Sequence, residues 1–84
     1  MTPEPLQPIA DAITHEVARF EAEYGMNLGV TVTIDVQAGT VTACGEGLKM
    51  WGPQQTLSRV LDRHGLRHDI RVQSARIIVY PSTT

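Results

Sequence analysis

The sequence of 84 residues lacks most features that identify membrane, secreted and disulfide-bonded proteins. Its single cysteine, Cys44, cannot form a disulfide within the chain, which favours a reducing, cytoplasmic location. No apolar run approaches the roughly 18 residues that a membrane-spanning helix needs. The N-terminus has no basic stretch followed by an apolar one, so we expect no signal peptide.

Groups that could carry catalysis or bind a metal are also few. Cys44 could be a nucleophile with His15, His64 or His68 as its base, but the sequence does not show that any of them is close, and lone cysteines are usually buried small residues or inert surface thiols. His64 and His68 have a spacing that suits zinc on one helix, but Gly65 interrupts a helix between them and no second ligand pair follows. Gly45 and Gly47 do not form a phosphate-binding or dinucleotide motif. We therefore predict a protein that is not an enzyme and that binds no cofactor or metal.

The clearest pattern that is present runs from Leu28 to Cys44, where apolar residues fill alternate positions. Such alternation places one face of a strand in a core and the other toward solvent. It predicts strands at 28–37 and 40–45, joined through Ala38 and Gly39. A loop of two or four residues sets apolar residues opposite one another, whereas a loop of three would scramble the faces. Gly39 can supply a positive φ in either loop.

Apolar residues at helical spacing predict two helices. The first covers residues 6–24 and ends at Gly25. The second covers residues 53–64, with Pro53 at the first helical position and Gly65 just beyond the end. The apolar stripe of each helix is expected to face a common core.

Residues 68–80 alternate again, but the phase changes at Gln73 and Ser74. We interpret this stretch as one strand with a β-bulge, because a hairpin here would need two very short strands. The prediction is thus a single domain, residues 1–84, of the α+β class: a two-layer sandwich in the order α-β-β-α-β. Its three-stranded antiparallel sheet has the order 2-1-3, with both helices on one face. The other face is expected to expose Thr31, Thr33, Asp35, Thr42, Cys44 and Arg71, with Arg76 nearby.

Charge is divided unevenly along the chain. Residues 1–46 carry seven acids and one arginine, a net charge of −6, whereas residues 47–84 carry six bases and two acids, a net charge of +4. The two halves can pair with each other, or an acidic side and an arginine-rich side can face charged partners.

The segment from Gly45 to Pro53 contains three glycines and the only tryptophan, Trp51. Leu48 and Trp51 can fold back as a plug at the end of the sandwich. Alternatively the segment is a presented loop, because Trp and Met are enriched at binding surfaces. The predicted partner-binding residues are Leu48, Lys49, Met50, Trp51, Arg59 and Arg63.

These features favour a small protein-binding module that acts as an inhibitor or adaptor. One concrete form is a phage or mobile-element inhibitor such as an anti-CRISPR, whose acidic helix would cover a basic groove. A homodimer through the edge of strand 68–80 is compatible with this function. The alternative is a nucleic-acid-binding domain that uses Arg59 and Arg63 of the second helix together with the open sheet face.

Overall fold

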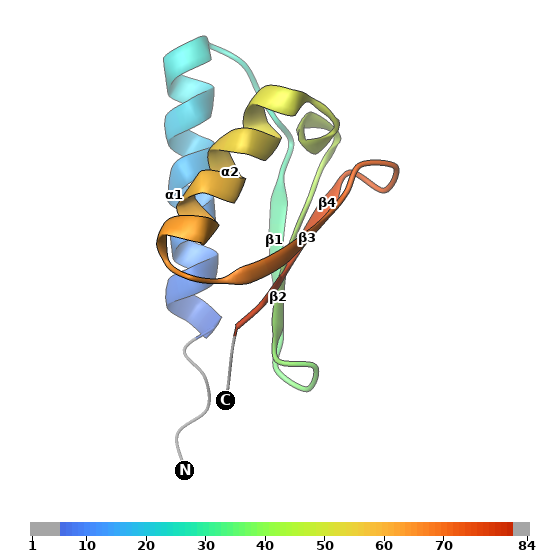
Figure 1. Cartoon of the computed structure of the whole chain (residues 1–84). Coiled ribbons are helices and arrows are strands. Elements are labelled where there is room, and N and C mark those ends of the chain that lie inside the picture. The colour runs from blue at the N-terminus through green and yellow to red at the C-terminus, as the bar shows by residue number, and fades with distance from the viewer. Residues whose placement is uncertain (1–5, 82–84) are drawn as a thin grey trace.

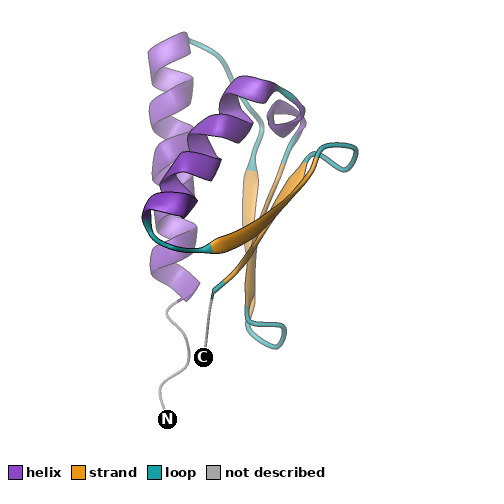
Figure 2. Ribbon diagram, in the orientation of Figure 1, coloured by secondary structure: helices purple, strands orange, loops and turns teal. Residues whose placement is uncertain are grey.

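The computed structural model describes residues 6–81, which form two helices packed on one face of a four-stranded sheet (Figures 1 and 2). All strand pairs are antiparallel. The α+β class and the two-layer arrangement agree with the prediction. The elements in chain order are α1 (Leu6–Tyr24), β1 (Thr31–Asp35), β2 (Thr40–Cys44), the short 3-10 helix η1 (Glu46–Lys49), α2 (Trp51–Arg63), β3 (Arg67–Arg71) and β4 (Arg76–Tyr80).

The predicted three-stranded sheet of order 2-1-3 is wrong, because the described residues form four strands in the order β1-β2-β4-β3. The stretch 68–80 is a hairpin and not one bulged strand. Its change of phase at Gln73 and Ser74 comes from a four-residue turn, residues 72–75, between Arg71 and Arg76. Strand β1, which we expected at the centre, lies at an edge, and β2 pairs with β4 instead.

Two strands and two helices supply the centre of the core. The inward residues of β2 and β4 are fully buried, and the apolar stripes of both helices cover them. Burial of each such aliphatic side chain stabilises the fold by about 1.5–3 kcal/mol. The most completely buried side chains are Ile13, Val41, Leu48, Leu57, Leu61, Ile77 and Val79.

The first hairpin has the four-residue loop that the alternation allowed. Asp35 is opposite Thr40, and Ile34 is opposite Val41, so apolar residues share the core face as expected. Gly39 adopts a φ of 68°, in the left-handed region. The Asp35 carboxylate accepts a hydrogen bond from the Ala38 N–H at 3.0 Å, which holds the turn.

The second hairpin repeats the first, 36 positions later in the chain. The pair Ile34–Val41 has its counterpart in Ile70–Ile77. The left-handed residue at position 39 has its counterpart at Ala75, whose φ is 53°. The pairs between β2 and β4 are related in the same way. Val41 corresponds to Ile77 and Val79 to Ala43, so the pair Val41–Val79 corresponds to the pair Ile77–Ala43. The molecule therefore consists of two consecutive α-β-β units, and the registers of their two hairpins are related by a two-fold axis through the Thr42–Ile78 pair.

The segment between the two units is packed rather than loose. A Cβ on Gly47 would lie 2.7 Å from the Cβ of Leu28, and a Cβ on Gly45 would overlap the Gly29 backbone. The side chain of Gln54 is buried and donates a hydrogen bond to the Leu48 carbonyl at 2.8 Å, which ties η1 to α2. Helix α2 begins at Trp51, two residues before the predicted start.

Candidate functional site

The predicted partner-binding residues of the segment 48–51 separate into one core residue and three surface residues. Leu48 is 1% exposed and belongs to the core. Lys49 is exposed and pairs with Glu46 at 3.4 Å. Met50 and Trp51 form an exposed apolar corner at the start of α2, where Trp51 is 70% exposed. Leu48 thus has the buried position that was considered for both residues, whereas Trp51 is presented on the surface.

Trp51 projects from the side of α2 that faces β3. Ser58 follows it by seven residues, which is two helical turns, so the two side chains share one side of the helix. The hydroxyl of Ser58 lies 2.9 Å from Nε2 of His68 on β3. After the turn at Gly65, β3 runs in the direction opposite to α2. The start of α2, where Trp51 lies, is therefore at the same end of the molecule as the turn that follows β3 at Val72 (Figure 1).

Strand β3 is an edge of the sheet, and no described residue pairs with its outer side. On its core face Ile70 is half-buried, and Val72 just beyond the strand is 48% exposed. The unpaired backbone of such an edge can hydrogen-bond to a strand of another chain. We call Met50, Trp51, Ile70, Val72 and the strand β3 the β3 edge surface.

The side chains of β3 on the open face of the sheet are charged. Nε and Nη2 of Arg71 donate to one Asp69 carboxylate oxygen at 3.0 and 2.9 Å. That hydrogen bond, followed by the attraction of the Asp69 charge, raises the pKa of Arg71 above its usual value. Both side chains are about half exposed, so they remain accessible to a partner.

The open face of the sheet differs between the two hairpins. On β1 and β2 it presents threonines, Cys44 and a single charge, Asp35. On β3 and β4 it presents three arginines, Asp69, Ile78 and Tyr80. Arg71 lies directly opposite Arg76 across the strand pair, an arrangement in which like charges repel. The sequence correctly predicted the open-face positions of Arg71, Asp35 and the threonines.

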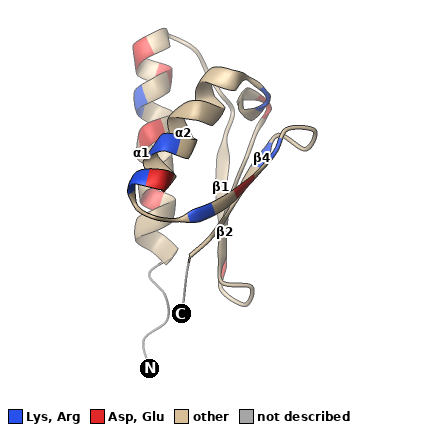
Figure 3. Ribbon diagram, in the orientation of Figure 1, with Lys and Arg blue, Asp and Glu red and all other residues tan. Residues whose placement is uncertain are grey.

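Arg59 and Arg63 do not share a surface with the arginines of the sheet. They lie exposed on α2, in the helical layer, whereas the open face is on the other side of the sheet (Figure 3). One flat ligand therefore cannot contact both groups at once. Four acids on α1, against Arg19, make the neighbouring helix acidic (Figure 3).

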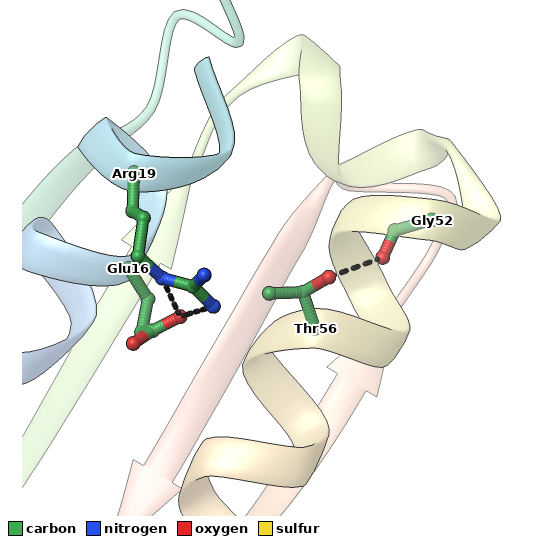
Figure 4. A network of polar contacts seen from close by, with 4 residues as sticks. All are labelled: Glu16, Arg19, Gly52 and Thr56. Carbon is green, nitrogen blue, oxygen red and sulfur yellow. Dashed lines mark hydrogen bonds and ion pairs between the residues drawn. The ribbon is translucent and has the colours of Figure 1, made fainter. Parts of the chain in front are cut away.

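Two polar pairs, one within α1 and one within α2, lie away from the β3 edge surface. Nη2 of Arg19 donates to the Glu16 carboxylate at 2.9 Å, and the guanidinium points toward Thr56 and Gly52 of α2 (Figure 4). The hydrogen bond to Glu16 and then its charge raise the pKa of Arg19. Arg19 is exposed and pairs within α1, and this group is not part of the candidate site.

The sequence analysis did not predict the hairpin at 67–80. It therefore did not include Asp69, Ile70 and Val72 among the residues of the candidate site. The signal was the short repeat Ile34-Asp35-Val36-Gln37 and Ile70-Arg71-Val72-Gln73. Two copies of a strand end and its turn imply two hairpins.

Within residues 6–81, no three His, Cys, Asp or Glu side chains come together as a metal site. None of the described helices combines the length and the apolar character that crossing a bilayer requires. Comparisons of the chain with protein-family models, with curated proteins and with solved structures found no match.

Proposed function

We propose that this protein is a non-enzymatic protein-binding module that acts as an inhibitor or adaptor through the β3 edge surface. The observation that carries the proposal is the position of Trp51, which is 70% exposed on the side of α2 beside an unpaired strand. Backbone hydrogen bonds along β3 and an aromatic anchor next to them together suit the capture of an extended segment or a strand of another protein.

The distribution of aromatic residues supports this proposal. Trp51, Tyr24 and Tyr80 are all exposed, Phe20 is half-buried, and these four are the only aromatic residues of the chain. Aromatic side chains usually contribute heavily to a core, but here aliphatic residues fill it. Covering a tryptophan removes about 150–250 Å² from water, so Trp51 has the size of an interface hot spot.

A pair of alanine substitutions tests the proposal with the full chain as bait against proteins of its native host. Trp51→Ala is expected to abolish capture of the partner and to leave the far-UV circular dichroism unchanged, because the side chain is outside the core. Val36→Ala is the matched control, since Val36 is 73% exposed at the turn of the other hairpin. Loss of capture with Val36→Ala, or its survival in Trp51→Ala, contradicts the proposal.

A second function, nucleic-acid binding, is favoured by one specific observation. The open face of β3 and β4 carries Arg67, Arg71 and Arg76 on one surface. Phosphate contacts would make the affinity fall steeply with salt. Binding that Arg76→Glu abolishes and Trp51→Ala leaves intact would favour this alternative over the protein-binding module.

A further inference from the structure

We propose that the partner of the β3 edge surface is a second copy of this chain, with the two β3 strands paired antiparallel about Ile70. The inference rests on the proposed function and names its partner. Pairing in this way joins two four-stranded sheets into one continuous sheet and makes a two-fold symmetric dimer.

The charges along the edge are self-complementary in this register. Asp69 and Arg71 flank Ile70 on the same strand, and both side chains lie on the open face. In an antiparallel pair centred on Ile70, Asp69 of each copy stands opposite Arg71 of the other. Two ion pairs between Asp69 of one copy and Arg71 of the other therefore cross the interface. Within a single chain these two residues lie 2.9 Å apart.

The core face of the edge matches in the same register. Ile70 meets Ile70 of the second copy, and Val72 meets His68. Ile70 is only half-buried and Val72 is 48% exposed, so both have apolar area left to cover. A shift by one residue would bring core-face residues opposite open-face residues, which selects against registers shifted by an odd number of residues.

Trp51 adds a third contact. Neighbouring strands are about 4.8 Å apart, whereas a helix with its side chains is about 10 Å wide. Since α2 contacts β3 through its Ser58 side, the two α2 helices would lie on the same face of the joined sheet with the sides that bear Ser58 and Trp51 toward each other. They would meet along these sides with their axes at least about 8–10 Å apart. The most exposed aromatic residue of the chain is covered by this contact.

The other edge of the sheet lacks this charge pattern. At the equivalent positions of β1, Thr33, Ile34 and Asp35 replace Asp69, Ile70 and Arg71. Pairing about Ile34 would set Asp35 against Thr33 and form no ion pair. A strand of an unrelated protein without alternating charges would likewise form no cross-strand ion pair with Asp69 and Arg71, so the edge discriminates in favour of its own copy.

Charge reversal followed by sedimentation velocity tests the dimer in the full chain. The wild type is expected to move from the mass of the 9.2 kDa chain to twice that mass as its concentration rises. Asp69→Arg and Arg71→Asp, each alone, place like charges in opposition and should weaken self-association on the order of tenfold or more. Arg63→Asp, on the other side of α2, is the control that should not change it.

Two further samples restore the complementarity. The double variant Asp69→Arg/Arg71→Asp exchanges the signs within one chain and is expected to dimerise again. An equal mixture of the two single variants should form a heterodimer, because one chain then carries two positive charges at the edge and the other two negative charges.

A wild type that stays monomeric at every concentration overturns the inference. So does a dimer that the single reversals leave unchanged, or a failure of both the double variant and the mixture to associate. If the chain is monomeric while Trp51→Ala still abolishes capture of a different protein, the second copy is the wrong partner and the proposed function stands. If Trp51→Ala affects neither association nor capture, the proposed function fails as well.

Discussion

The two hairpins of this protein have the same strand register and turn length but different surface residues. Both turn through four residues and place a left-handed residue at the last turn position, Gly39 in one and Ala75 in the other. Their inward residues pair across the same two-fold axis. Outward, the first hairpin is rich in threonine, and the second carries arginines and a charged edge. The comparison teaches that the repeated backbone serves the core, while the differences lie where a partner can reach.

The largest expected effect breaks the shared core. Ile77→Ala removes a fully buried side chain from β4 and should lower the free energy of unfolding by about 3–4 kcal/mol. Ile78→Ala is the matched control, because the next residue is half-exposed on the open face and should cost less than half as much. Urea denaturation of both variants measures the difference. Equal losses would mean that the open face is covered as fully as the core.

The next effect tests the turn that both hairpins share. Gly39→Ala should lower the free energy of unfolding by about 1–1.5 kcal/mol, because a side chain is disfavoured at a φ of 68°. No atom lies within 4 Å of a Cβ placed there, so a steric clash does not contribute. Gly39→Asn should cost clearly less, since asparagine tolerates this conformation. If the two variants were equally destabilised, the loss would not come from the backbone conformation.

A smaller effect concerns the edges, where the hairpins differ on the core side. Position 68 of β3 is a histidine, whereas Val32 fills the equivalent position of β1. His68→Val should cost about 1 kcal/mol, because it removes the contacts of the ring with the Ser58 hydroxyl at 2.9 Å and with the Leu66 carbonyl at 3.1 Å. Ser58→Ala removes only the first contact and should cost no more, and the double variant should cost no more than His68→Val alone. Additive losses in this double-mutant cycle would show that the two side chains are not coupled.

The smallest effect on stability compares the two turn valines. Val36 and Val72 occupy equivalent positions and are both exposed. Val36→Ser and Val72→Ser should each change the free energy of unfolding by less than about 0.5 kcal/mol. Only Val72→Ser should weaken self-association in sedimentation, because only the second hairpin adjoins the β3 edge surface. An equal response of both variants would show that the two hairpins are also alike in binding.

Much of the fold could be predicted from the sequence because its signals are local. The alternation from Leu28 to Cys44 and the apolar stripe of the first helix depend on neighbours in the chain. In the structure α1 covers Leu6–Tyr24, and β1 covers only Thr31–Asp35 of the predicted strand 28–37. Strand order depends instead on which edges meet in space. The preference for a bulge at Gln73 failed because a four-residue turn shifts the alternation in the same way as one extra residue does.

The candidate site could be predicted only in part. Trp51 and Met50 were selected because their residue types are typical of interfaces, and both are exposed, but the same reasoning also selected Leu48, which is in the core. Exposure decides between these two roles, and exposure depends on tertiary packing. The sequence does not distinguish Asp69 and Arg71 from other surface charges, because their position on an edge strand follows from the strand order.

The two-fold arrangement also bears on how the chain folds. Each α-β-β unit closes its own hairpin through contacts that are near in sequence, which is a fast process. Among the described residues, the pairing of β2 with β4 and the contact between the helices are the main links between the units, and the partners in the β2–β4 pair are more than thirty residues apart in the chain. The entropy of closing that long loop is lost before the core between the units forms. We therefore expect that the step that joins the two halves around Thr42 and Ile78 limits the rate of folding.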